Sequence, residues 1–284
     1  VAQCFTARSE RFAALVQTWR DDNLVFRWST GWSDGSLLDA PTNDGHPRYA
    51  VHGGMNNLAQ SLAAQLARQG VRVETNVQAT AAAPNGNGWQ VQDDSGRIRR
   101  SRSLVLTAPV PQSLALLSAA GVALAAEQRA ALQAVAYAPC LCALCWAEGT
   151  VWLPAPGAVQ RPQADISWIA DNQRKGISPY APVFTLHASP AWSAAHFDEP
   201  DEALLDTFCA ALSQWTATGN LQSREVQIKR WRYALPVALH PERCLRAEGL
   251  PPLFFGGDGF GAPRVEGAVL SGLAVADALA DTLT

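Results

Sequence analysis

The chain has 284 residues, of which 48% are hydrophobic and 17% are charged, and its formal net charge is −3. This composition provides enough apolar surface for a buried core and argues against a disordered chain. The lack of a basic excess argues against a nucleic-acid partner. No apolar run approaches the ~20 residues of a membrane helix, so we expect no membrane span and a cytoplasmic protein.

The six cysteines do not suggest a disulfide framework in a chain of this length. Three of them stand close together as Cys140, Cys142 and Cys145, at a spacing that resembles a metal site. Apolar residues surround them, and no second pair of ligands follows. We therefore favour a buried strand here over a metal or redox site, and we predict no metal ligands.

The first part of the chain carries alternating helix and strand signals. Ser9 is a candidate N-cap, and the apolar residues after it recur at helical spacing. Gly, Asp, Asn and Pro dominate 29–47, which is typical of a loop. Apolar and polar residues alternate over 71–77, which predicts a strand. The predicted elements are a helix over 9–20, a strand over 24–28, a loop over 29–47, a helix over 56–69 and a strand over 71–77.

Turn signals then divide the chain into short strands. The segment Asn85-Gly-Asn-Gly88 predicts a hairpin turn that leads into a strand over 89–92. The apolar run 103–108 ends at Pro109, a pattern typical of a buried parallel strand. A small meander therefore interrupts an otherwise doubly wound arrangement of strands and helices.

The middle of the chain predicts a separate mixed or antiparallel sheet with an aromatic face. Its expected elements are helices over 127–135 and 201–215 and strands over 141–146, 166–170, 183–188 and 226–235. The C-terminus again combines strand and helix signals, with a strand over 253–256, a glycine-rich loop over 257–261 and a helix over 265–283. The predicted fold class is therefore α/β, with two interleaved α+β domains.

The closing strand, glycine loop and helix carry the chemistry. Glycines after the strand let the backbone approach a ligand closely, and the carboxylate of Asp258 follows just past the strand end. The helix that begins near Glu266 and Gly267 offers free N–H groups to an anion. An ordinary glycine turn into a capped helix gives the same pattern, so this unit alone is suggestive and not specific.

The run from Gly256 to Ala276 resembles the C-terminal flavin-binding motif of FAD-dependent amine-oxidase-like proteins, and most of all their renalase-type branch. Further segments resemble segments of that branch in the same order. They are 2–8, 47–59, 104–109, 186–192 and 230–236. The sequence departs from the branch at Cys4, where Tyr is usual, and at Gly53, where Pro is usual.

The family that the chain resembles opens with a strand, a Gly-x-Gly-x-x-Gly turn and a helix, which cradle the FAD pyrophosphate. No such turn followed by a helix occurs early in this sequence. The chain begins with Val1, and its single methionine is Met55. We therefore expect an N-terminally incomplete chain.

The resemblance implies two discontinuous domains. An incomplete Rossmann-like domain would bind FAD, and a domain with a mixed or antiparallel sheet would bind substrate. The expected bounds are 48–112 and 245–284 for the FAD-binding domain, and 1–47 and 113–244 for the substrate-binding domain.

The resemblance also implies a set of cofactor contacts. Val77 would lie near the adenine, Asp258 would bond the ribityl chain or the phosphates, and the last helix would direct its first N–H groups at the flavin. A side chain at Gly267 would enter the flavin's space. Glu266 has an alternative reading as a first-turn carboxylate without a ligand. The implied cofactor-binding residues are Val77, Ala108, Pro109, Gly257, Asp258, Arg264, Val265, Glu266, Gly267 and Ala268.

Three residues of the central domain are candidates for catalysis in a substrate pocket. His187 lies in an apolar strand and is either a packed core histidine or a catalytic base. Trp231 and Tyr233 share one strand face, and they are either core rings or rings that face the flavin. The chain's two lysines, Lys175 and Lys229, stand in no motif that places them at a flavin.

The resemblance implies an FAD-dependent oxidase with a small-molecule substrate and O2 as its partners. A dihydronicotinamide isomer or an amine would give a hydride to the flavin, and reoxidation by O2 would yield H2O2. The alternative is an N-terminally truncated, non-catalytic fragment that no longer binds FAD. A serine hydrolase is a poor third reading, because the sequence has no Gly-x-Ser-x-Gly elbow. Nothing in the sequence predicts an oligomeric state.

Overall fold

The computed structural model describes residues 2–35 and 42–283. The chain forms two compact units, each built from two separate stretches of sequence. The first unit comprises Val1–Leu62 and Ala138–Leu235, and the second comprises Ala63–Tyr137 and Pro236–Thr284. The units therefore divide the chain after residues 62, 137 and 235, whereas the predicted domains divide it after 47, 112 and 244.

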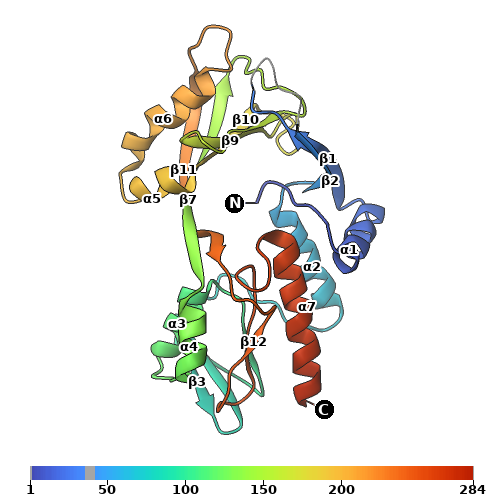
Figure 1. Ribbon diagram of the computed structural model, residues 1–284, viewed down its shortest axis with the longest axis vertical. Coiled ribbons are helices and arrows are strands. Elements are labelled where there is room, and N and C mark those ends of the chain that lie inside the picture. The colour runs from blue at the N-terminus through green and yellow to red at the C-terminus, as the bar shows by residue number, and fades with distance from the viewer. Residues whose placement is uncertain (1, 36–41, 284) are drawn as a thin grey trace. The chain divides into compact units, whose positions relative to one another are not determined.

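Both units contain helices and strands (Figure 1). The elements wholly within the first unit are α1 (Glu10–Asp21), β1 (Val25–Trp32), β2 (Thr42–Val51), β8 (Ala158–Gln160), β9 (Ile166–Asp171), β10 (Val183–Ala188), α5 (Pro190–Ala195) and α6 (Asp201–Ser213). Those wholly within the second are β3 (Ala79–Asn85), β4 (Gly88–Asp93), β5 (Ile98–Ser101), β6 (Leu104–Leu106), α3 (Val110–Ser118), α4 (Ala126–Gln133), β12 (Leu245–Arg246), β13 (Leu253–Phe255) and α7 (Arg264–Leu283). Three elements run from one unit into the other, namely α2 (Asn56–Arg68), β7 (Ala136–Glu148) and β11 (Gln222–Ala238).

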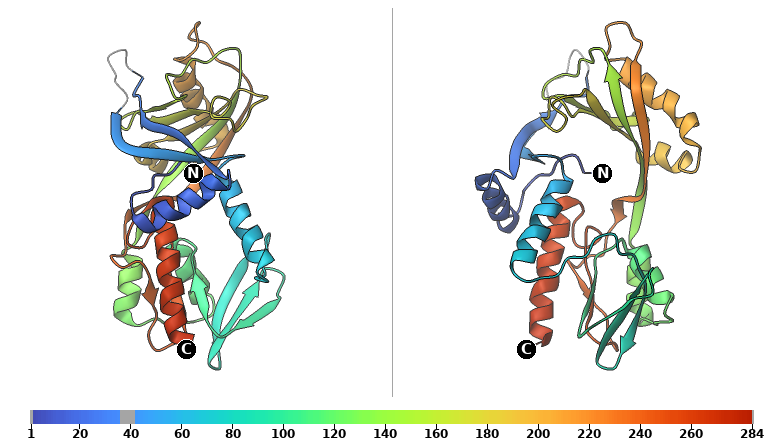
Figure 2. Two further views of the ribbon diagram at one scale, coloured as in Figure 1. Left: turned by 90° about the vertical axis from the view of Figure 1, so that its right-hand side faces the viewer. Right: turned by 180° about the vertical axis from the view of Figure 1, so that it is seen from behind.

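The first unit is built around a five-stranded sheet with the strand order β11-β7-β10-β9-β8. Strand β10 pairs antiparallel with β7 and with β9, and β8 pairs antiparallel with β9. Helices α5 and α6 lie against one face of this sheet in every ribbon view (Figures 1 and 2). The N-terminal part of the same unit packs against the other face of the sheet.

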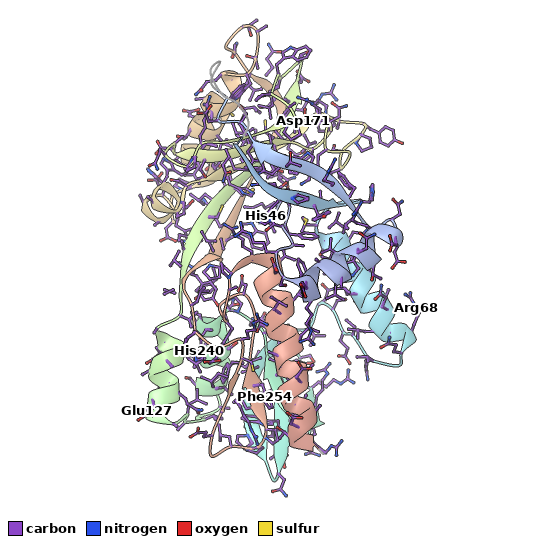
Figure 3. All side chains as sticks on the ribbon, turned by 45° about the vertical axis from the view of Figure 1, so that its right-hand side comes forward. His46, Arg68, Glu127, Asp171, His240 and Phe254 are labelled. Atoms are coloured by element: carbon purple, nitrogen blue, oxygen red, sulfur yellow. The ribbon has the colours of Figure 1, made fainter. Side chains whose placement is uncertain are left out.

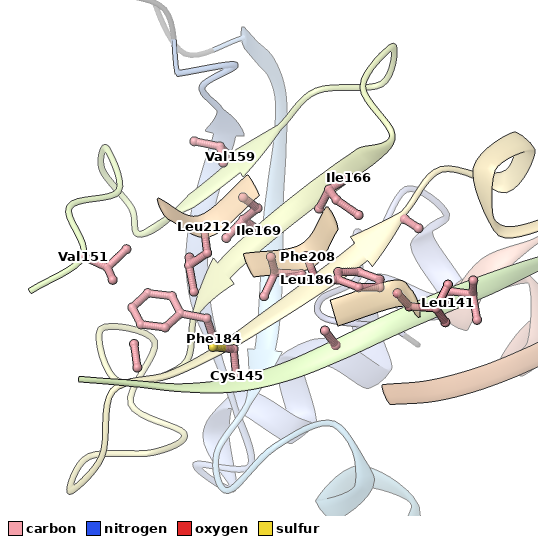
Figure 4. Close-up of a cluster of buried hydrophobic side chains, with 14 of the residues drawn as sticks. Leu141, Cys145, Val151, Val159, Ile166, Ile169, Phe184, Leu186, Phe208 and Leu212 are labelled. Atoms are coloured by element: carbon pink, nitrogen blue, oxygen red, sulfur yellow. The ribbon is translucent and has the colours of Figure 1, made fainter. Parts of the chain in front are cut away.

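A hydrophobic core fills the space between the sheet and α6 (Figure 4). Leu204, Phe208 and Leu212 recur at four-residue spacing, so they form one apolar face of α6. Phe184 of β10 is buried against this helix face. Because strand side chains alternate between faces, His187 of the same strand points away from this core.

The opposite face of the sheet carries tryptophans, which we call the aromatic face. Trp168 of β9 lies there, and β1 brings Trp28 and Trp32 against it. The ring centroids of Trp32 and Trp168 are 4.7 Å apart, and those of Trp28 and Trp32 are 4.8 Å apart. Both pairs are T-shaped, the arrangement that the aromatic quadrupole favours. The structure thus contains the aromatic sheet face that the sequence predicts.

The second unit contains two small sheets. Strand β13 lies between β12 and β6, antiparallel to the first and parallel to the second. Strands β3, β4 and β5 form an antiparallel meander, with the predicted hairpin turn between β3 and β4. A core shared by these strands and by α3 and α4 includes Trp89, Leu117, Leu132, Phe255 and Phe260. The mixture of helices with parallel and antiparallel strands confirms the α/β class.

Elements with strong local signals agree with the prediction. Ser9 caps α1, and its hydroxyl accepts the N–H of Phe12. The C-terminal helix, α7, begins at Arg264, one residue before its predicted start. Among the described helices, none combines the length and the apolarity that crossing a membrane requires.

Two local predictions are wrong. The segment 29–47 is not a loop throughout, because β1 continues to Trp32 and β2 begins at Thr42, while 36–41 lies outside the described residues. The segment 71–77 alternates as a strand does, yet none of the described strands pairs with it. A strand needs a hydrogen-bonded neighbour, which a local sequence pattern does not supply.

The three clustered cysteines lie in the predicted strand, which is β7. Alternation places Cys145 in the core beneath α6 and Cys142 on the aromatic face, so their sulfur atoms point to opposite sides. Burial raises the pKa of both thiols to about 12. These cysteines are therefore free, protonated packing residues of the sheet.

Candidate functional site

Parallel strands β6 and β13 bring two chain segments to one edge of their sheet. The N–H of Gly256, just after β13, donates to the carbonyl of Leu106 over 3.1 Å. Because parallel strands end at the same edge, the segment 108–109 after β6 and the segment 257–258 after β13 leave the sheet together. Each segment leads on to a helix, α3 or α7. The predicted crevice residues therefore share one sheet edge.

Close backbone packing explains the first two glycines of this connection. A Cβ on Gly256 would lie 2.9 Å from both Ser271 Oγ and Val275 Cγ2, two atoms of α7. Gly257 has a φ of +128°, and a Cβ there would lie 3.3 Å from the carbonyl oxygen of Thr107. The N–H of Gly257 also donates to Ser271 Oγ over 2.9 Å. The connection is thus fixed to α7 on one side and lies close to the end of β6 on the other.

The backbone that precedes α7 leaves room only for glycine at position 267, in the first turn of this helix. A Cβ there would lie 1.7 Å from the carbonyl oxygen of Ala262. The expectation that a side chain at Gly267 would enter the flavin's space is therefore corrected, because it would first collide with the backbone. Arg264 has a φ of +75°, a left-handed conformation that costs a non-glycine residue about 1–3 kcal/mol. Backbone strain of this kind clusters at ligand sites.

Asp258 and Tyr137 form the polar part of this sheet edge. Burial raises the pKa of Asp258 above its ordinary value of 3.8. The hydroxyl of Tyr137 accepts the N–H of Val110, at the start of α3, over 3.3 Å. Burial raises the pKa of Tyr137, and the negative charge of Asp258 raises it further. Tyr137 therefore links the connection after β13 to the start of α3, a role that no sequence motif marks.

Val77 lies in the extended segment that no described strand pairs with, and it is 42% exposed. An ion-pair network holds the same segment at Glu74, which bonds Arg99. Arg99 also bonds Asp93 over 2.6 Å. Hydrogen bonds from Ser95 and Arg99 hold the pKa of Asp93 well below its ordinary range, so this carboxylate stays charged. None of these contacts tests the predicted adenine contact of Val77, which stays a prediction.

His187 lies on the aromatic face of the first unit. It stands directly opposite Cys142 of β7 and Trp168 of β9. Burial lowers the pKa of His187 to about 3, and the positive charge of Lys175 contributes to the shift. The imidazole is therefore neutral near pH 7, and a group with this pKa is a weak general base there. Its chemistry at that pH is hydrogen bonding.

Trp231 and Tyr233 share one side of β11, because they are two residues apart. Val226 and Ile228 of the same strand pack against the core beneath α6, so alternation places Trp231 and Tyr233 on the opposite, aromatic face. Trp231 is 48% exposed, so it is not a core ring. The three candidate pocket residues thus lie on one sheet face, and their contact with substrate stays a prediction.

Lys175 was missed by the sequence motifs, although it is only 5% exposed. It follows β9 in a turn where the carboxylate of Asp171, labelled in Figure 3, accepts the N–H of Gln173 over 2.8 Å. Its Nζ lies 4.3 Å from the ring centroid of Trp28 and donates to the side-chain oxygen of Gln3 over 3.2 Å. Burial lowers the pKa of Lys175 to about 8. Few sequence signals mark such a residue, because tertiary packing alone buries it.

Comparison with known families assigns the chain to a class of protein. The family of flavin containing amine oxidoreductases matches residues 16–280, which is nearly the whole chain. The chain belongs to this family. The family defines the class as flavin-containing amine oxidoreductases, for which FAD is the expected cofactor.

Solved structures agree on the fold. A protein assigned as a protoporphyrinogen oxidase from Exiguobacterium sp. 255-15 matches with a TM-score of 0.62 and 15% identity, over 82% of this chain and 52% of that one. A putrescine oxidase bound to putrescine matches at 0.57 and 16%, over 83% and 54%. An oxidoreductase from Methanosarcina mazei matches at 0.60 and 13%, over 95% and 73%. The chain thus spans about half the length of the first two structures.

The second unit offers groups that fit parts of FAD. Backbone N–H groups at the start of a helix suit a pyrophosphate or a flavin oxygen, and the carboxylate of Asp258 suits ribityl hydroxyls. A Cβ on Gly257 would lie 3.3 Å from the carbonyl oxygen of Thr107, so glycine keeps a side chain out of the space at the end of β6. The residues that would hold FAD are those of 108–109, 257–258 and 265–268.

Proposed function

We propose that this chain forms the flavin-binding and substrate-binding parts of a renalase-like oxidase. Its second unit would bind FAD, and its first unit would bind a dihydronicotinamide that is reduced at an unproductive ring position. When bound, the cofactor would supply hydride acceptance from such a substrate, and its reoxidation would transfer two electrons and two protons to O2 to give H2O2. Family membership supports the cofactor, and the aromatic face of the first unit supports the substrate class.

The part of the chain expected to hold FAD is a rigid sheet edge. The connection after β13 is fixed by hydrogen bonds to Leu106 and Ser271, so the carboxylate of Asp258 has a defined position. The first turn of α7 would supply N–H groups and the positive end of a helix dipole to the flavin ring. That end stabilises negative charge, which develops on a flavin when it is reduced.

The positive charge at the aromatic face favours a neutral dihydronicotinamide over a protonated amine as the substrate. Lys175 and Lys229 act on this face, and the imidazole of His187 stays neutral. A protonated amine would meet cations here, whereas a neutral dihydronicotinamide ring would meet indole rings. Flat rings stack favourably on tryptophan, so the second substrate suits this surface better. Amine oxidation is the second candidate, because the family description names it and a similar structure binds putrescine.

Oxygen consumption tests the choice directly. The purified chain, supplied with FAD, is mixed either with 6-dihydronicotinamide adenine dinucleotide or with putrescine, and O2 uptake and H2O2 are measured. We expect uptake with the dihydronicotinamide and a background rate with putrescine. Faster uptake with putrescine would favour amine oxidation. A chain that retains no FAD would favour the alternative of a non-catalytic fragment.

A substitution on β11 tests the role of the aromatic face in turnover. Trp231→Ala removes a half-exposed ring and is expected to lower turnover more than flavin content. The control is Trp152→Ala, which removes a ring that is 70% exposed in the same unit. If turnover and flavin content fall in parallel in the Trp231 variant, the ring has only a structural role.

A further inference from the structure

Three polar atoms around the aromatic face are buried without a hydrogen-bond partner in the described part of the chain. They are Nε1 of Trp28, Nε1 of Trp168 and Nε2 of His187. Folded proteins rarely leave such atoms unpaired, because each has given up its hydrogen bonds to water. Several such atoms in one place therefore indicate a partner that the chain itself does not supply.

These three side chains are neighbours. In the register of β9 and β10, His187 stands directly opposite Trp168, and directly opposed side chains have Cβ atoms ~4.5–5.5 Å apart. The rings of Trp28 and Trp168 form a T-shaped pair with centroids 6.1 Å apart. The unpaired atoms thus belong to one contiguous cluster of rings and not to separate parts of the unit.

Lys175, whose pKa burial lowers to about 8, adds a positive charge to the cluster at neutral pH. Its Nζ lies above the ring of Trp28, and its charge acts on the imidazole of His187. The turn that carries it is anchored to β10, because the side-chain amide of Asn172 donates to Thr185 Oγ1 over 2.8 Å. The ammonium group is therefore held beside the rings and not free to swing into solvent.

The chemistry of these groups specifies the missing partner. An indole N–H can only donate a hydrogen bond, so the missing partner of Trp28 and Trp168 must accept one. The ammonium of Lys175 already donates to Gln3, so it contributes only its charge. The rings around them favour a flat group, and Lys175 disfavours a cation. We propose that Trp28, Trp168 and His187, with Lys175 beside them, form a subsite for the carboxamide group of a flat conjugated ring. This deepens the proposed function, on which it rests for the claim that the ring belongs to the substrate.

Binding of two matched probes tests the subsite. Nicotinamide and 3-(aminomethyl)pyridine share one ring, but the first carries a carboxamide and the second a cationic amine. Both are titrated into the purified chain without flavin, and affinity is measured by calorimetry and tryptophan fluorescence. We expect nicotinamide to bind at least tenfold more tightly. Equal affinities, or tighter binding of the amine, would overturn the proposal.

Variants locate the binding. Trp168→Phe keeps a ring and removes one donor, and it is expected to weaken nicotinamide about fivefold. The control is Trp215→Phe, whose Nε1 is also buried and unpaired but whose ring stacks on Arg161 instead. Equal effects of the two substitutions would overturn the proposal. If circular dichroism shows that the Trp168 variant does not fold, Trp28→Phe takes its place with the same expectation.

The outcome of these binding experiments is independent of the outcome of the turnover assay. Selective nicotinamide binding that depends on Trp168 establishes the subsite even where no dihydronicotinamide is oxidised, and the proposed function then fails alone. Oxidation of the dihydronicotinamide by a chain whose Trp168 and Trp215 variants bind nicotinamide equally would retain the function and remove the subsite.

Discussion

Asp258 illustrates a residue whose position costs stability. Burial raises the pKa of this carboxyl group, so the folded chain holds its proton to a higher pH than the unfolded chain does. Stability therefore falls as pH rises from about 3.8 through the folded pKa, since the folded state then binds more protons than the unfolded state. A residue kept at such a cost is typical of a ligand site.

Asp258→Asn tests this reading. The free energy of unfolding at pH 7 should rise, because the variant no longer buries a charge. The difference from the unsubstituted chain should disappear near pH 3, where both side chains are neutral. Urea unfolding across this pH range measures the effect, with the exposed Asp198→Asn as the control. A loss of stability at pH 7 would contradict the assignment.

Tyr137 is a second residue with a defined task. Tyr137→Phe removes the hydroxyl that accepts the N–H of Val110 and leaves the ring in place. We expect a loss of about 1 kcal/mol in the free energy of unfolding, because Val110 is buried and its N–H would lose its partner. Tyr180→Phe, at a position that is 99% exposed, is the control and should change nothing. Equal unfolding midpoints for the two variants would count against the link.

The glycine-rich connection between β13 and α7 shows how far sequence reasoning reaches at the scale of elements. The strand, the loop and the helix were all predicted, because apolar runs, glycines and helical periodicity are local signals. The structural reason for the glycines is not predictable from the sequence. Gly256 and Gly267 leave room for α7 and for the backbone at Ala262, contacts that arise only once the chain is folded.

Other failures have the same physical origin. The segment 71–77 has the right alternation but no paired strand in the described fold, and 29–47 has loop composition although strands enter it from both ends. Pairing is non-local, so composition within a window does not decide it. Lys175 was missed for a related reason, since its burial comes from Gln3 and Trp28, far away in the sequence. Trp231 and Tyr233 are predicted to share one strand face because alternation is a local signal, and both lie in β11, two residues apart.

Ser271→Ala tests whether α7 fixes the connection after β13. The hydroxyl of Ser271 is fully buried and accepts the N–H of Gly257 over 2.9 Å. Its loss should cost about 1–2 kcal/mol in the free energy of unfolding and weaken FAD binding, because the loop that carries Asp258 loses its anchor. Thr282→Ala, which removes a hydroxyl that donates to the carbonyl of Ala278 within α7, is the control. Unchanged FAD affinity in the Ser271 variant would separate this contact from the cofactor site.

At the scale of the whole molecule, the predicted site residues divide between the two units. The second unit gathers every predicted FAD contact, and the first gathers the aromatic face and its lysines. Family membership supports a flavin enzyme, while the solved structures that resemble the chain support its fold. The chain spans about half the length of two of those structures.

Titration of the purified chain with FAD tests the central claim most directly. Binding is followed by the quenching of flavin fluorescence, and the amount of flavin bound per chain is measured after gel filtration. We predict saturable binding of one FAD per chain, weakened at least tenfold by Asp258→Asn and unchanged by Asp198→Asn. A chain that binds no FAD, or that binds it equally well in both variants, would contradict the assignment of the second unit as the flavin site.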